Sequence, residues 1–164
     1  MATSLNPDIS SQRVLIIGAG LAGAEAAHFL ANKQVPVVLY EIKQLEESDD
    51  GETSGLGELI CSNSLKSNDA GSAHGMLKHE MRGLGSLVIR AAEQFAVPAG
   101  SALAVDRHQF SRTITKTLGD HPLIELVVGA EVSDPVEVAN QHGCSHTIIA
   151  SGPITSQKLG EWIA

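Results

Sequence analysis

The sequence is poor in aromatic residues, in cysteine and in long apolar runs, and each shortage excludes a class of protein. Aromatic side chains make up 3% of the 164 residues, and the two cysteines are Cys61 and Cys144. With so few cysteines and no apolar leader in the first residues, a disulfide-stapled secreted fold is excluded, and we expect a cytoplasmic protein with free thiols. No apolar run approaches the roughly 20 residues that a membrane-spanning helix needs, so we expect no membrane contact.

The sequence also lacks an excess of positive charge. Its formal net charge of −8 at pH 7 excludes nucleic-acid binding over the whole surface, because phosphate contacts need clustered lysine and arginine. The charge is unevenly distributed. Residues 41–58 carry seven acidic side chains and one basic side chain, whereas residues 61–90 carry four basic and two acidic ones. A local basic surface is therefore compatible with the sequence.

A metal site is not expected. His142, Cys144 and His146 alternate along the chain, so a strand would present them on one face. A zinc site normally needs a fourth ligand and a different spacing. We interpret this segment as the entry to a strand.

What the chain does contain is an ordinary share of apolar residues, 43%, and 16 glycines, in an order that predicts a single α/β domain. The apolar residues 13–17 predict a buried parallel strand, the alanine-rich residues 21–33 a helix, and the run after Pro36 a second strand that Glu41 closes. Strand, helix and strand form a βαβ unit over residues 13–41, which is typical of a Rossmann-like parallel sheet.

The rest of the chain predicts a long loop region followed by more helices and strands. Residues 42–72 hold few periodic apolar positions, so we expect mostly loop there, and loops of this length are usually functional or disordered. Apolar spacing predicts a helix over residues 74–95, interrupted near Gly83 and Gly85. Further along we expect a strand at 102–105, a helix from its N-cap Asp106 to about Leu118, a strand at 123–128 and a buried strand at 147–150.

A glycine fingerprint lies between the first predicted strand and the first predicted helix. It reads Gly18-Ala19-Gly20-Leu21-Ala22-Gly23. In such a G-x-G-x-x-G pattern the first glycine permits a tight turn, the second lets the backbone approach a pyrophosphate, and the third allows close packing of helix on strand. The helix N-terminus adds unpaired N–H groups and the positive end of its dipole. We therefore expect residues 18–23 to bind a dinucleotide.

Glu41 completes this candidate cofactor site. It lies 23 residues after Gly18, at the end of the second predicted strand, where a carboxylate can accept hydrogen bonds from ribose hydroxyls and would repel a 2′-phosphate. The alternative, a glycine turn and a charged strand end without a ligand, requires all these features to coincide by chance. The fingerprint alone does not separate FAD from NAD, and we interpret the ligand as FAD.

Cys61 is the candidate catalytic residue. It lies in the segment Glu58-Leu-Ile-Cys61-Ser-Asn-Ser-Leu-Lys66-Ser-Asn68, where hydroxyl and amide groups and a lysine surround a lone thiol. A nearby cation and hydrogen-bond donors lower the pKa of a thiol and raise its thiolate fraction, which a nucleophile needs. The alternative is a cysteine packed as a small hydrophobe beside Leu59 and Ile60. The residues alone leave both interpretations open.

Several segments together resemble the folate- and FAD-dependent tRNA (uracil-5-)-methyltransferase family, which makes ribothymidine in the T-loop of tRNA. In chain order they are VLIIGAGLAGAEAA, PVVLYE, GELICSNSLKSN, GMLKHEMRGLGSLVIRAAE, VPAGSALAVDRHQFS and IIASGPITS. The LICSNSLKSN and LKHEMRGLGSL segments are the specific ones. The wider class, which includes the flavoprotein that modifies the wobble uridine of tRNA, shares mainly the glycine fingerprint and the DR-x-x-F element.

The resemblance implies a function and a set of partners. In that family FAD carries a one-carbon unit from methylenetetrahydrofolate to C5 of uracil in tRNA, with NAD(P)H as reductant. Cys61 matches a cysteine implicated in that chemistry, either as the nucleophile at uracil C6 or in proton transfer, and a second family cysteine has no match at Cys144. Asp106 and Arg107 match the DR element, where Asp106 also suffices as a helix N-cap. Lys66 and Arg82 are candidate contacts to tRNA phosphate or folate, or else solvated charges.

The resemblance covers only the N-terminal part of the longer family members. We therefore expect residues 1–164 to be the N-terminal part of an FAD-binding domain, with the βαβ unit at 13–41, the Cys61 loop region at 42–72 and the remaining helices and strands at 74–150. The missing C-terminal portion of the enzyme would be a partner. Two alternatives remain: an FAD- or NAD(P)-dependent oxidoreductase on the same fold, and a non-catalytic FAD-binding fragment.

Overall fold

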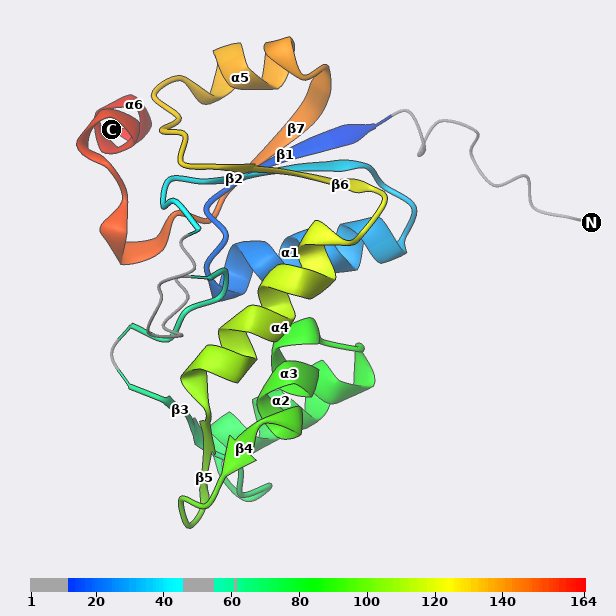
Figure 1. Ribbon diagram of the computed structural model, residues 1–164, viewed down its shortest axis with the longest axis vertical. Coiled ribbons are helices and arrows are strands. Elements are labelled where there is room, and N and C mark those ends of the chain that lie inside the picture. Colours follow the sequence, from blue (N-terminus) through cyan, green and yellow to red (C-terminus); the bar gives the residue numbers. More distant parts are fainter. Residues whose placement is uncertain (1–11, 46–54, 61) are drawn as a thin grey trace, which may run out of the picture. The chain divides into compact units, whose positions relative to one another are not determined.

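The computed structural model describes residues 12–45, 55–60 and 62–164 (Figure 1). These residues divide into two compact units, one made of residues up to Gln44 and from Leu118 onward, the other of residues between Leu45 and Thr117. In chain order the elements are β1 (Arg13–Ile17), α1 (Leu21–Asn32), β2 (Val37–Glu41), β3 (Ser64–Ser67), α2 (Ala73–Gly83), α3 (Leu87–Gln94), β4 (Ala96–Val97), β5 (Ala102–Val105), α4 (Arg107–Gly119), β6 (Ile124–Val128), α5 (Pro135–Gln141), β7 (Cys144–Ile149), the 3-10 helix η2 (Gly152–Ile154) and α6 (Gln157–Ile163).

The first unit is built on a parallel sheet with the strand order β6-β2-β1-β7. Leu15 of β1 lies beside Val38 of β2 on one side and Thr147 of β7 on the other. Within this unit α1 covers one face of the sheet and α5 lies over the other (Figure 1). The parallel sheet with helices on both faces confirms the predicted Rossmann-like α/β fold.

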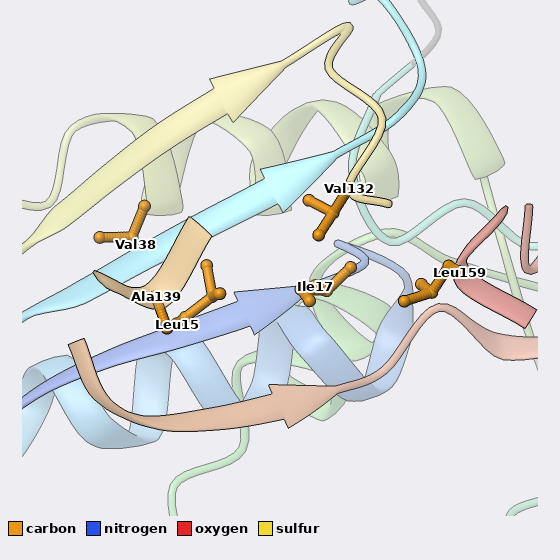
Figure 2. Packing of buried hydrophobic residues seen from close by; sticks show 6 residues of the cluster. All are labelled: Leu15, Ile17, Val38, Val132, Ala139 and Leu159. Atoms are coloured by element: carbon orange, nitrogen blue, oxygen red, sulfur yellow. The ribbon is translucent and has the colours of Figure 1, made fainter. Parts of the chain in front are cut away.

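Apolar side chains from alternate strand positions form a core on the α5 face of this sheet (Figure 2). The cluster consists of Leu15, Ile17, Val38, Val132, Ala139 and Leu159. Residues two apart in a strand point to the same face, which is why Leu15 and Ile17 both reach this core. On the other face the buried residues of α1 include three alanines, Ala24, Ala27 and Ala31, and small side chains let a helix backbone approach the strands closely.

The second unit combines a small antiparallel sheet, in the order β3-β5-β4, with helices α2, α3 and most of α4. Its predicted long helix is interrupted where expected. α2 ends at Gly83, Gly85 has a positive φ of +76°, and Ser86 caps α3 by accepting a hydrogen bond from Ile89 N at 3.1 Å. A serine N-cap that satisfies an orphan N–H explains why a second helix begins there.

One predicted strand has a different environment from the one expected. The segment 147–150 was expected to be buried, but β7 begins earlier, at Cys144, and its residues from Ser145 to Ile149 are exposed. The prediction of burial was wrong because β7 pairs only with β1 in the described part of the chain and so forms an edge of the sheet. An apolar run predicts a strand well but does not distinguish an edge position from a central one.

Helix α5 was not predicted, although it carries a clear start signal. Asp134 Oδ1 accepts hydrogen bonds from Val136 N at 2.9 Å and Glu137 N at 3.1 Å, and Pro135 occupies the first helical turn. Both features are typical of helix N-termini. Across the residues that the structure describes, none of the helices combines the length and the apolarity needed to cross a bilayer.

Candidate functional site

The turn after β1 requires glycine at its first position. Gly18 has a φ of +99°, and a Cβ added there would lie 2.6 Å from the carbonyl oxygen of Ala150. Gly18 N donates a hydrogen bond to Tyr40 O at 2.8 Å, and Ala150 N donates one to Ile17 O at 2.7 Å. The turn is thus enclosed by the ends of β2 and β7 on either side of β1, and a side chain has no room.

Gly23 fixes the start of α1 against that turn. A Cβ at Gly23 would lie 1.8 Å from the carbonyl oxygen of Gly18, well inside van der Waals contact. This glycine was expected to allow close packing of the helix on the strand, and the structure confirms the close approach. The two glycines therefore set the shape of the turn, independently of any ligand.

Gly20 differs from both, because a Cβ added there would meet no atom of the described residues within 4 Å. Gly20 is the N-cap of α1, no side chain of the described residues caps this helix, and its first turn contains no acidic residue. Within the described residues the N-terminal N–H groups thus have no capping side chain, and the positive end of the helix dipole lies at this turn. This is the arrangement in which a helix N-terminus receives a phosphate.

Glu41 lies against the same turn. Its side chain is only 8% exposed, and its Oε2 accepts a hydrogen bond from Ala19 N at 2.8 Å while its Oε1 accepts one from Lys43 N at 3.1 Å. An ionised carboxylate offers about four acceptor positions, so within the described part of the chain two are left for ribose hydroxyls. The residues present fit the adenosine and pyrophosphate part of a dinucleotide cofactor. The structure brings residues 18–23 and Glu41 together, and their binding of a cofactor stays a prediction.

Position 61 lies outside the described residues, but the segment that precedes it is held firmly by α4. Leu56 N donates a hydrogen bond to Thr115 Oγ1 at 2.8 Å, and Ser111 Oγ donates one to Leu56 O at 2.8 Å. Arg107 Nη2 donates to Leu59 O at 3.2 Å. The arginine of the DR element therefore supports the backbone two residues before Cys61, a role that sequence reasoning did not identify.

Asp106 has the structural role expected of it. Its Oδ1 accepts hydrogen bonds from His108 N and Gln109 N, both at 3.1 Å, which satisfies two of the unpaired donors at the start of α4. The prediction that Asp106 caps this helix is confirmed.

The segment that follows position 61 is held by two cations of α2. Lys78 is 5% exposed, and its Nζ donates to Ser67 O at 2.8 Å and to His74 O at 3.2 Å. Burial, and then the nearby positive charge of Arg82, lower the pKa of Lys78.

Arg82 forms an ion pair with Glu93 and donates to Asn68 Oδ1 at 2.7 Å. Arg82 is thus engaged within this unit, whereas the side chain of Lys66 is exposed.

A polar network in the first unit was not found from the sequence. The Tyr40 hydroxyl and His142 Nε2 are hydrogen-bonded at 2.8 Å, His142 Nδ1 lies 3.4 Å from Glu125 Oε1, and Glu125 also pairs with Arg13. Burial, then the charges of Glu125 and Cys144, raise the pKa of Tyr40. The members lie as far as 129 residues apart in sequence, so no local pattern could have indicated them.

The segment around Cys144 forms a strand entry, as interpreted from the sequence. Cys144 begins β7 and is partly buried, and burial is the main cause of its raised thiol pKa. His142 is the C-cap of α5. In the described ranges, no three His, Cys, Asp or Glu side chains gather as a metal ion would require.

Comparison with known proteins gives a match over nearly the whole chain. The glucose inhibited division protein A family matches residues 13–160. The methylenetetrahydrofolate--tRNA-(uracil-5-)-methyltransferase TrmFO of Magnetococcus marinus is 52% identical over 152 residues, covering 92% of this chain and 34% of that protein. The protein of the same name from Enterococcus faecalis is 48% identical, covering 93% and 33%. The chain therefore spans about a third of the length of these relatives.

Among solved structures, the GidA-related protein from Thermus thermophilus is similar with a TM-score of 0.40 and 23% sequence identity. The similarity covers 72% of this chain and 38% of that one. A likeness of this degree adds nothing to the sequence matches.

Proposed function

Because the chain belongs to the glucose inhibited division protein A family, we propose that it forms the N-terminal part of the FAD-binding domain of a tRNA (uracil-5-)-methyltransferase. The names of its relatives support this function, and the chain would need the C-terminal part that those longer relatives possess. The observation that carries the proposal is a buried Glu41 hydrogen-bonded to the glycine turn beside the open Gly20. We also propose that the protein acts in the cytoplasm.

Within this proposal the first unit holds the cofactor. The N–H groups at the start of α1 would receive the pyrophosphate at Gly20, and the free lone pairs of Glu41 would accept hydrogen bonds from the adenosine ribose. The chemistry that bound FAD supplies in this reaction is one-carbon transfer and reduction, with methylenetetrahydrofolate as donor and NAD(P)H as reductant. The first turn of α1 contains no acidic residue that would repel the phosphates.

Cys61 would act on the uracil of tRNA. Uracil C5 is a poor nucleophile until a thiolate adds at C6, or until a base assists the step, and either task suits a cysteine. Ser111 and Arg107 donate to carbonyl oxygens of residues 56–59, and Thr115 accepts from Leu56 N; these hydrogen bonds fix the segment that precedes this position. Arg107 would then be a positioning residue that acts through the backbone.

The cofactor proposal is tested by mixing the purified 164-residue chain with FAD, removing free flavin by desalting and measuring the visible absorbance. We expect about one flavin per chain. A Gly20→Ala variant should retain at least tenfold less flavin with an unchanged melting temperature, because its Cβ meets no protein atom but enters the phosphate path. Gly83→Ala is the matched control, since its Cβ is equally free, and it should retain flavin normally.

The activity proposal needs a longer protein and is tested in a chimera. This chain would replace the corresponding third of the Magnetococcus marinus relative, and formation of 5-methyluridine in a tRNA transcript would be measured with methylenetetrahydrofolate and NAD(P)H. We expect Cys61→Ser to abolish product and Cys144→Ser to leave it nearly unchanged. A chimera that binds flavin and oxidises NAD(P)H but never methylates tRNA would instead favour an oxidoreductase.

A further inference from the structure

The strand β3 is interrupted by a β-bulge. Ser64 lies opposite Ala104 and Ser67 lies opposite Ala102, with an irregular register between them. Between these two pairs β3 contains two residues and β5 contains one, which is the count that defines a bulge. The second of the two residues is Lys66, whose φ is +67°.

A left-handed backbone is unfavourable for any residue with a Cβ, and glycine adopts it most readily. Gln34 and Lys66 are the two non-glycine residues with a positive φ in the described ranges. Gln34 directly follows Lys33, the C-cap of α1, where a left-handed residue is common. Lys66 lies in β3 and not at a helix end, and its own N–H donates to Ser64 Oγ at 3.1 Å. This local hydrogen bond supports the turn but does not explain why a lysine stands here instead of a glycine, so the reason is sought in its side chain.

Three hydrogen bonds hold the bulge in place. Lys66 N donates to Ser64 Oγ at 3.1 Å, Lys78 Nζ donates to Ser67 O at 2.8 Å, and Asn68 N donates to Ser101 O at 2.7 Å. The second comes from a lysine that is 5% exposed, and burying an ammonium group is costly unless it is well hydrogen-bonded. A strained conformation persists when its surroundings over-determine it, and such residues concentrate at functional sites.

We propose that Lys66 is a phosphate-contact residue for the RNA substrate, and that Lys78 is the positioning residue that holds Lys66 in its left-handed conformation. This inference rests on the proposed function, which supplies the polyanionic ligand. A bulge re-aims a side chain, and Lys66 is exposed beside the exposed polar residues Ser62 and Asn63. A lysine ammonium is a compact point charge that binds single phosphates well.

The test separates the effect of losing the Lys66 side chain from the effect of relieving the strain in its backbone. Binding of a fluorescently labelled tRNA transcript to the 164-residue chain is measured by anisotropy at several low salt concentrations. Melting temperatures are measured in parallel. We expect Lys66→Ala and Lys66→Gly each to weaken binding about fivefold and to reduce the slope of log K against log salt by about one. Lys33→Ala, which removes an exposed lysine from the first unit, should change binding less than twofold.

The two substitutions of Lys66 should differ in stability. Lys66→Gly should melt about 2 °C above Lys66→Ala, because glycine adopts the left-handed backbone without strain. Lys78→Met should weaken RNA binding although Lys66 is intact, and Lys78→Arg should restore part of the loss. If Lys66→Gly binds RNA as well as the unchanged chain, or melts no higher than Lys66→Ala, the inference is wrong.

The same experiment distinguishes failure of this inference from failure of the proposed function. A chain that retains flavin but does not bind the transcript at any salt concentration would overturn the role of Lys66 and leave the cofactor proposal intact. Binding of RNA that is insensitive to Lys66 and Lys78 would also overturn it, while still supporting a tRNA substrate. A chimera that methylates tRNA at the normal rate with Lys66→Ala would contradict a role in substrate binding directly.

Discussion

Two of the turns in this molecule have a left-handed backbone but use different residues for it. Gly18 in the first unit has a φ of +99° and no room for a side chain, whereas Lys66 in the second has a φ of +67° and an exposed side chain. In the first turn the residue type follows from backbone geometry alone. In the second, geometry would favour glycine, so the lysine costs stability and needs another reason. Glycine at the first turn therefore follows from the backbone shape, whereas a non-glycine residue in the same conformation points to a candidate function.

The largest expected effect comes from placing a side chain where the first turn has no space. Gly23→Ala would set a Cβ 1.8 Å from the Gly18 carbonyl oxygen, so the helix must shift against its strand. We expect a loss of at least about 3 kcal/mol in the free energy of unfolding, together with loss of flavin retention. Chemical denaturation measures the loss, with Gly20→Ala as the control that should unfold at the unchanged denaturant concentration. Equal stability of the two variants would contradict the packing described.

Glu41→Gln tests the side chain that joins the first turn to its ligand. The carboxylate accepts two backbone N–H groups, and an amide offers one oxygen and a donor group in its place. We expect a loss of about 1–3 kcal/mol in unfolding free energy, because one buried donor loses its acceptor. Flavin retention should fall by at least tenfold. Unchanged flavin retention in a folded Glu41→Gln chain would remove Glu41 from the proposed site.

Lys78→Met tests whether Lys78 stabilises the backbone of the second turn, around Lys66. The substitution keeps the length of the side chain but leaves the carbonyl oxygens of Ser67 and His74 without its hydrogen bonds. The relief of a buried charge offsets part of this cost, so we expect a net loss of about 1 kcal/mol. Hydrogen exchange of the amides in β3 and β5 should rise more than exchange in the parallel sheet. Uniform change in both units would mean that Lys78 does not act locally.

The smallest expected effect concerns pH and serves as a check on the first unit. Tyr40 is the only tyrosine of the chain, and its pKa is raised from 10.0, mainly by burial and then by Glu125. A raised pKa in the folded state stabilises the fold below pH 10, and this contribution is lost as pH rises through the folded pKa. The ultraviolet absorbance of the phenolate should therefore rise with a midpoint above pH 10 in the folded chain. A midpoint at 10 or below would contradict the partly buried Tyr40–His142 contact.

Local sequence patterns predicted the first unit well because its decisive features are local. The run at 13–17, the glycines from Gly18 to Gly23 and the strand end at Glu41 lie within one βαβ unit, and each residue type has a single physical reason. The exposed edge position of β7 and the pairing of Tyr40 with His142 were not predictable, because both depend on which strands become neighbours. Strand order is a property of the whole chain and leaves no local signal.

The second unit was less predictable for the same reason. The break between α2 and α3 could be read from Gly83 and Gly85, but the bulge at Lys66 exists only through its register with β5. A lysine in a polar loop gives no indication of its backbone conformation. The hydrogen bonds from Arg107 and Lys78 to the segments on either side of position 61 also join residues of separate elements. They became visible only in three dimensions.

The most direct test of the central claim is an equilibrium titration of the 164-residue chain with FAD and, separately, with FMN, followed by quenching of flavin fluorescence. The glycine turn, the start of α1 and Glu41 would hold the adenosine and pyrophosphate half, which FMN lacks. The account predicts saturable binding of FAD at about one per chain, competition by ADP and at least tenfold weaker binding of FMN. Equal affinity for FAD and FMN, or no competition by ADP, would contradict it.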